Sequence, residues 1–200
     1  MTGCMDDEAK RGYHHGDLRS ALLAAAEEEL AERGVEGFSL RQVARRAGVS
    51  HAAPAHHFGD AQGLLTALAA DGFYRFLAAQ AAREARADPD PRAQLVAAGL
   101  GYIDFALDRP ALFRLLFGSD RPDFTDPALD TASTAAFFHL REQVDAAGGA
   151  DVDAAAVWAM AHGLADLLGN GRLKSVLGLP QPARDEVLVA ILQRAFPAAG

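Results

Sequence analysis

The sequence predicts an all-α fold, and three observations support that prediction. Alanine supplies 44 of the 200 residues, whereas valine, isoleucine and threonine together supply 17, a balance that favours helices over strands. Apolar residues recur at helical spacing along most of the long segments. Glycine, proline and aspartate gather between these segments, where helices end and begin. Apolar residues make up 50% of the chain, which is enough for a packed core.

The first expected helix covers residues 16–34 and follows a disordered arm at residues 1–12. Asp17 is expected to cap its N-terminus, because an aspartate side chain accepts hydrogen bonds from the free amides of the first turn. Gly34 is expected to end it, since glycine adopts the left-handed conformation that follows many helices.

Two short helices are expected between residues 39 and 58. Ser39 followed three residues later by Gln42 has the pattern of a capping box, in which each side chain satisfies a free backbone amide. Gly48 fits the left-handed position of a tight turn, and Ser50 is expected to cap the next helix. Two helices joined by a glycine turn, with the first helix packed behind them, form a helix-turn-helix.

This helix-turn-helix lies in a locally basic stretch. The chain has a formal net charge of −8, but no Asp or Glu occurs from Gly37 to Gly59. A solvated helical surface is the simpler explanation of such a stretch, and a nucleic-acid surface is the other. In the second case the arginines neutralise phosphates, and the next helix reads base edges in the major groove. The residues expected at DNA are Ser39, Arg41, Gln42, Arg45, Arg46, Ser50, His51, Ala52, Ala53, His56 and His57.

Helices are expected to continue after the basic stretch. Asp60 is expected to cap a fourth, longer helix, and the Pro/Asp segment at residues 86–94 separates it from the next. A buried central helix and a short helix that starts at Pro110 then lead into a loop. The last three expected helices are Pro127–Ala147, Val152–Gly169 and Ala183–Phe196.

Aromatic residues concentrate in the second half of the chain, where seven of the 15 lie between residues 101 and 140. They are either ordinary core or the lining of an apolar pocket. His162 follows Trp158 by four residues, so the two side chains meet, and His162 is either a core histidine or a polar group that faces a ligand. The residues expected at an effector are Phe73, Tyr102, Phe105, Phe113, Phe117, Phe137, Trp158 and His162.

Other functional classes find no support in the sequence. The adjacent histidine pairs His14/His15 and His56/His57 diverge on a helix and chelate poorly, so no metal is expected. No nucleophile elbow, Walker loop or dinucleotide fingerprint is present, so neither an enzyme nor a cofactor is expected. The single Cys4 excludes an internal disulfide, and no apolar run approaches the roughly 20 residues of a membrane span. A cytoplasmic protein without a membrane partner is expected.

Residues 13–68 resemble the N-terminal domain of tetracycline-repressor-like (TetR) regulators. The later "WAMAHGLADLL", with Trp158, His162 and Gly163, resembles the Trp-His-Gly (WHG) type of C-terminal domain in that family. The resemblance implies about nine helices, a DNA-binding domain at residues 13–59 and an effector-binding and dimerisation domain at residues 60–200. It also implies a homodimer that represses transcription at a palindromic operator until a small, largely apolar effector releases it.

The implied dimer interface consists of the helices near residues 152–169 and 183–196. Small residues of the first helix would allow close contact, and an apolar stripe of the second would supply burial. These residues are Ala154, Ala155, Ala161, Ala165, Val187, Leu188, Ile191 and Ala195.

Two positions depart from the family pattern. Ala55 stands where a phosphate-binding Tyr is usual, and Ala61 stands where Lys is common. Pro54 is expected on the fourth residue of its helix, where it would remove one intrahelical hydrogen bond. The alternative function is therefore a helical small-molecule-binding protein whose DNA binding is weakened or lost.

Overall fold

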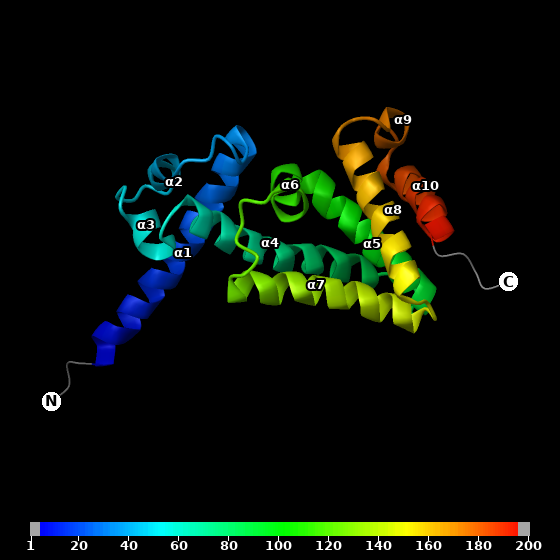
Figure 1. The fold of residues 1–200 in the computed structure, drawn as a ribbon, viewed down its shortest axis with the longest axis horizontal. Helices are drawn as coiled ribbons and strands as arrows, with labels where there is room; N and C mark the ends of the chain where they lie inside the picture. Colours follow the sequence, from blue (N-terminus) through cyan, green and yellow to red (C-terminus); the bar gives the residue numbers. More distant parts are fainter. Residues whose placement is uncertain (1–4, 196–200) are drawn as a thin grey trace.

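The structure is a computed structural model that describes the backbone of residues 5–195 and the side chains of residues 18–195. Over this range it contains ten helices and no strand, which confirms the predicted all-α fold (Figure 1). The first four helices are α1 (Met5–Arg33), α2 (Leu40–Arg46), α3 (Ala53–Phe58) and α4 (Ala61–Glu84). The others are α5 (Pro91–Asp108), α6 (Pro110–Gly118), α7 (Pro127–Ala146), α8 (Asp151–Gly169), α9 (Lys174–Leu177) and α10 (Gln181–Ala195).

Helix α1 is longer than predicted. It begins at Met5, so Asp17 lies inside the helix and not at its N-cap, and the helix overlaps the arm expected at residues 1–12. Residues 1–4 lie outside the described part of the chain. The end of α1 agrees with the prediction, because Gly34 follows it with a φ of 67° and donates its amide to Leu30 at 2.9 Å.

The predicted capping box at the start of α2 is wrong. Ser39 does occupy the N-cap in an extended backbone conformation, but within the described chain its hydroxyl makes no capping hydrogen bond. Gln42 points inward, where its buried Oε1 atom finds no donor among the described residues. A Gln42 side chain turned toward the interior does not reach back to the Ser39 amide, which the capping box requires.

Helix α3 begins later than predicted. Its N-cap is Ala52 and not Ser50, whose carbonyl instead accepts from the amide of Ala53 at 3.0 Å in the preceding turn. Pro54 therefore lies in the first turn, where backbone amides have no intrahelical partner, and it removes no hydrogen bond. Gly48 adopts a φ of 67°, as the predicted glycine turn requires.

Aspartate side chains cap three of the longer helices, of which the cap at Asp60 was predicted. Asp60 caps α4 through an acceptor bond from the amide of Gly63 at 2.9 Å. Asp90 and Asp126 cap α5 and α7 in the same way, and each is followed by a proline that occupies the first helical position. The four-residue helix α9 was not predicted, which accounts for ten helices where about nine were expected.

Helix α5 is the centre of the larger part of the molecule. It contacts α4, α6, α7, α8 and α10, and Figure 1 shows α4 and α7 lying side by side along one flank. The approach of α5 to α4 depends on Gly101, since a Cβ atom there would lie 2.5 Å from the Cα of Gln80. The two backbones are therefore in direct contact. This contact fixes how the side chains of α4 are placed along those of α5.

Candidate nucleic-acid interface and ligand pocket

Helices α2 and α3 present a basic surface to solvent. We define it as the exposed side chains of both helices and the turn between them. The opposite faces are buried, with Val43 and Ala44 of α2 and Pro54 of α3 against the core. The glycine turn at Gly48 sets the angle between the helices, and Val49 then donates its amide to Ala44 at 3.0 Å. The exposed residues of the basic surface are Arg41, Arg45, Ser50, His51, Ala52, Ala55 and His56.

Arg46 does not belong to this surface, although the sequence predicted it at DNA together with Arg41 and Arg45. Its Nε donates to Glu29 at 3.0 Å, and its other nitrogens pair with Glu28 and Glu32. These carboxylates hold the pKa of Arg46 above its usual range, the hydrogen bond with Glu32 being the largest cause. Three carboxylates around one guanidinium give the group a net negative charge, so Arg46 does not attract a phosphate. Arg46 instead ties α2 to α1.

The remaining residues predicted at DNA are less exposed. Ser39, Gln42, Ala53 and His57 are half-buried. The ring of His57 packs edge-on against that of His56, with ring centres 5.5 Å apart. Most of the predicted residues thus lie on one side of α2 and α3. Arg46 and Gln42 do not, because Arg46 pairs with α1 and the Gln42 Oε1 atom is buried.

Arg19 is a residue that the sequence analysis missed. It is exposed on α1, and its guanidinium lies 5.5 Å from the centre of the Phe58 ring at the end of α3. This cation–π contact holds a positive charge beside the basic surface. Nothing in the local sequence of α1 signals this, because the proximity arises from tertiary packing.

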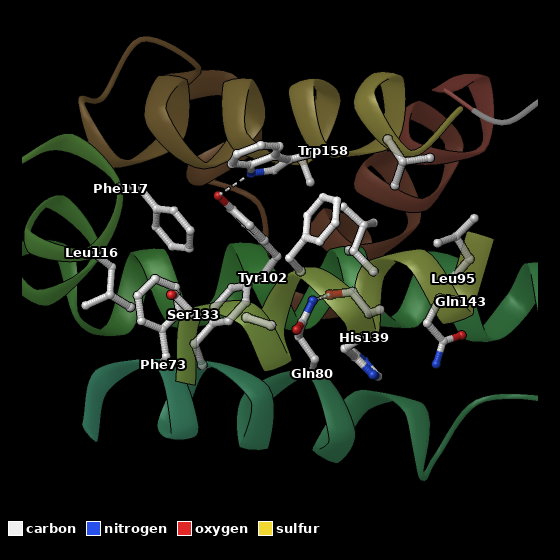
Figure 2. Close-up of a pocket in the computed structure, with 18 of the residues that line it drawn as sticks. Phe73, Gln80, Leu95, Tyr102, Leu116, Phe117, Ser133, His139, Gln143 and Trp158 are labelled. Atoms are coloured by element: carbon white, nitrogen blue, oxygen red, sulfur yellow. Dashed lines mark hydrogen bonds between the residues drawn. The ribbon is translucent and has the colours of Figure 1, made fainter. Parts of the chain in front are cut away.

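A pocket lies between α4, α5, α7 and α8, with a cavity volume of about 300 Å³. Volumes of roughly 300–1,000 Å³ are usual for small-molecule sites. Figure 2 shows most of its lining residues, which are mainly apolar and include several aromatic rings. They are Phe73, Phe76, Gln80, Leu95, Ala98, Gly99, Tyr102, Leu116, Phe117, Phe124, Ser133, Ala136, Phe137, His139, Leu140, Gln143, Val157, Trp158 and Ala161.

Five of the eight residues predicted at an effector line this pocket, namely Phe73, Tyr102, Phe117, Phe137 and Trp158. The other three stand behind the lining. Phe105 packs edge-on against Phe76, and Phe113 packs against both His162 and Tyr102. The aromatic residues of α4, α5 and α6 therefore form a continuous cluster, of which only one side faces the cavity.

His162 reaches the pocket through Tyr102, so it is neither an isolated core histidine nor a lining residue. The Tyr102 hydroxyl lies 2.7 Å from Nδ1 of His162 and accepts from Nε1 of Trp158 at 3.4 Å (Figure 2). Since an indole N–H only donates, the hydroxyl proton is available to Nδ1 of His162. Burial raises the pKa of Tyr102 well above its usual range, and the Trp158 bond offsets part of that shift. His162 thus orients Tyr102 from behind the pocket wall.

A polar group of residues, also missed by the sequence analysis, lies away from Tyr102 and Trp158 (Figure 2). His139 and Gln143 of α7 both contact Oε1 of Glu84 on α4, at 2.7 and 3.4 Å. Gln80, one helical turn before Glu84, lines the same part of the cavity. The i,i+4 spacing within each helix was visible in the sequence, but the pairing of α4 with α7 was not.

Two parts of the chain match known protein families. Residues 95–195, half of the chain, match the family described as tetracyclin repressor-like, C-terminal domain. Residues 22–68 match the family described as bacterial regulatory proteins, tetR family. The chain belongs to the TetR family. The second match contains the basic surface. The first contains the pocket residues of α5 to α8, whereas the pocket residues of α4 lie between the two matched ranges.

Curated relatives of this TetR-family chain match less than half of its length. The HTH-type transcriptional regulator BetI of Burkholderia thailandensis is 38% identical over 86 residues. BetI of Burkholderia mallei is 36% identical over 86 residues. In each case the alignment covers 43% of this chain and 44% of the relative, so the chain spans less than half the length of these curated relatives.

Solved structures match nearly the whole TetR-family chain. A protein described as having unknown function, from Rhodococcus sp. RHA1, is 38% identical and covers 92% of this chain and 95% of its own, with a TM-score of 0.76. The multidrug binding protein EbrR, solved in complex with imidazole, is 22% identical, covers 91% of this chain and 96% of its own, and has a TM-score of 0.57. The second likeness shows the fold alone.

None of the helices that the structure describes is long and apolar enough to cross a membrane. Among the described side chains, no group of three or more His, Cys, Asp or Glu residues is arranged to hold a metal ion.

Proposed function

We propose that this TetR-family protein is a transcriptional regulator that binds operator DNA through its basic surface and a small apolar effector in its pocket. The observation that carries the proposal is the exposed, acid-free face of α2 and α3, with its Gly48 turn, in a chain of net charge −8. Arg41 and Arg45 of α2 contact phosphates, while Ser50 and His51 approach base edges.

One helix connects the two sites. Helix α4 starts at the Asp60 cap directly after α3, and further along it contributes Phe73 and Gln80 to the pocket. An effector that displaces α4 therefore changes the position of α3. By linkage, operator DNA and effector then alter one another's affinity by the same factor. We assign residues 13–59 to DNA binding and residues 60–200 to effector binding and dimerisation.

The homodimer uses the outward face of α8 together with α10. Three of the small residues predicted for this contact, Ala154, Ala161 and Ala165, are buried in the protomer's own core, as is Leu188 of α10. The outward face carries an apolar set at helical spacing that includes Ala155 from the predicted contact. Its exposed members are Val152, Ala155, Ala156, Ala159 and Leu167.

A second candidate function is a small-molecule-binding protein without a DNA target. Ala55 is exposed on α3 and Ala61 is the first residue of α4, so neither offers a phosphate the contact that a Tyr or Lys would. The withdrawal of Arg46 removes a further cation. This candidate and the regulator share the pocket and differ only in the basic surface.

Selection of binding sites from random double-stranded DNA, followed by footprinting, tests the proposal. We expect enrichment of a palindromic site and protection of two half-sites about one helical turn apart. Recovery of no sequence above background at low salt would favour the candidate that lacks a DNA target.

A further inference from the structure

One buried polar atom of the pocket, on Gln80, has no hydrogen-bond partner among the described residues. The Gln80 side chain is 7% exposed, and its Nε2 donates to the carbonyl of Ala98 at 3.3 Å. Its Oε1 is buried and accepts no hydrogen bond from any residue that the structure describes. A buried acceptor without a donor is unfavourable, so such an atom in a ligand pocket marks a place for a donor supplied by the ligand.

The surroundings of Gln80 also restrict the charge of that ligand. None of the residues that line the pocket is a lysine or an arginine. Glu84 lies one turn further along α4, with its carboxylate held by His139. The neighbouring Arg83 is bound to Asp104 and Asp185 outside the cavity. A negative group near Gln80 would therefore meet a carboxylate and an acceptor, and the basic side chain in this part of the lining, His139, already pairs with Glu84.

The rest of the cavity restricts the shape of the ligand. Phe73, Phe76, Phe117 and Tyr102 pack around it with ring centres 5.0–5.6 Å apart, mostly edge to face. Such rings accept a further planar ring by stacking or edge contact. A volume of about 300 Å³ suits a molecule of two or three fused rings.

From these observations we infer that the effector is a small planar aromatic molecule that bears an N–H or O–H donor for Gln80 Oε1 and no anionic group. The inference rests on the proposed function, since it specifies the ligand of the same pocket. Gln80 is the residue that determines specificity, because it is the lining residue whose acceptor is buried and unpaired. Tyr102 and Trp158, whose polar atoms already pair, contribute ring contacts.

Calorimetric titration with three bicyclic probes at neutral pH tests the inference. The probes are 2-naphthol, which carries an O–H donor, 2-fluoronaphthalene, which has nearly the same shape and no donor, and 2-naphthoate, which is an anion. We expect 2-naphthol to bind about tenfold more tightly than 2-fluoronaphthalene, the effect of one hydrogen bond to a buried acceptor. We expect 2-naphthoate to bind most weakly of the three.

The variant Gln80→Met keeps the length of the side chain and removes the acceptor. It should abolish the preference for 2-naphthol while it retains or improves binding of 2-fluoronaphthalene. Gln62→Met, at an exposed position of the same helix far from the pocket, should leave the preference unchanged. Thermal unfolding of each variant, measured alongside, shows whether the pocket is intact.

Four outcomes overturn the inference, and the first three need only the unaltered protein. They are equal affinity for 2-naphthol and 2-fluoronaphthalene, tightest binding of 2-naphthoate, no binding of any probe, and a preference for 2-naphthol that survives in Gln80→Met. Selection of DNA sites uses no probe, so its failure would reject the regulator while leaving the order of probe affinities intact. Failure of the probes would leave DNA binding intact.

Discussion

Nε of Arg46 donates to Oε2 of Glu29 at 3.0 Å, which links the helix-turn-helix to the helix behind it. The Glu29 side chain is only 2% exposed, so its carboxylate depends on this guanidinium. Arg45, the preceding residue, is exposed to solvent on α2. Two adjacent arginines therefore have different roles, one in the fold and one in the proposed contact with DNA.

Arg46→Ala should change the stability of the protein, whereas Arg45→Ala should change its affinity for DNA. Removal of Arg46 leaves a buried carboxylate unpaired, so the melting temperature falls while the salt dependence of DNA binding stays the same. Removal of Arg45 leaves the melting temperature unchanged and lowers the slope of log affinity against log salt by about one, the loss of one phosphate contact. Thermal unfolding and operator titrations across a salt series measure both. An unchanged slope for Arg45→Ala would remove Arg45 from the interface.

The double substitution Ala55→Tyr with Ala61→Lys should tighten DNA binding. A phenol and an ammonium group each add a phosphate contact, so affinity rises roughly tenfold on the operator and on a scrambled site alike. Lysine at the start of α4 opposes the helix dipole, which reduces part of this gain. The control Ala82→Lys, at an exposed position late in α4, adds the same charge and should leave affinity nearly unchanged. No gain on either site would mean that α3 does not dock as proposed.

Gly101→Ala should destabilise the protein by about 2–3 kcal/mol, because the new Cβ would overlap the backbone of α4. It would lie 2.5 Å from the Cα of Gln80 and 2.7 Å from the carbonyl oxygen of Ala79, and neither atom moves without shifting the helix. Gly169→Ala is the matched control, since a Cβ at that end of α8 meets no described atom within 4 Å. Urea unfolding compares the two. Equal stability of both variants would contradict the close approach of α4 and α5.

Stability should fall at alkaline pH through Tyr102. Burial raises the pKa of Tyr102 in the folded state, so the unfolded chain loses this proton first, at a pH of about 10. Its contribution to the free energy of unfolding is fully present below that pH and decreases as the pH rises toward the raised value. Urea unfolding from neutral to alkaline pH should show a shallower decline for Tyr102→Phe. Tyr74→Phe, which removes an exposed hydroxyl, should behave like the unaltered protein.

Ala159→Asp should yield monomers. Ala159 is exposed on the outward face of α8, and a carboxylate there would be buried without a partner when two copies associate. A charge at Ile191 of α10 would also destabilise the protomer itself, because this side chain packs partly against its core. Sedimentation of Ala159→Asp beside Ala78→Asp, an exposed position of α4, measures the effect. A soluble dimer for Ala159→Asp would place the interface elsewhere.

The sequence determined the local features of this protein. Helix starts at Asp60, Asp90 and Asp126 follow from side chains that bond amides two or three residues away, and the ends at Gly34 and Gly48 follow from backbone freedom. The acid-free stretch likewise showed where a nucleic-acid surface would lie. All of these depend on interactions within one or two helical turns, which residue order alone specifies.

The tertiary structure decided which side chains meet across helices. Arg46 faces three acids of α1, Ser39 and Gln42 form no capping box, and the Tyr102 hydroxyl finds Trp158 and His162 some sixty residues away. Gln80 and His139 both line the pocket because α4 packs against α7. Phe105, Phe113 and His162 lie behind the lining residues. Helical periodicity assigns a residue to a face, but only the packing of helices, set by contacts such as that at Gly101, decides what that face meets.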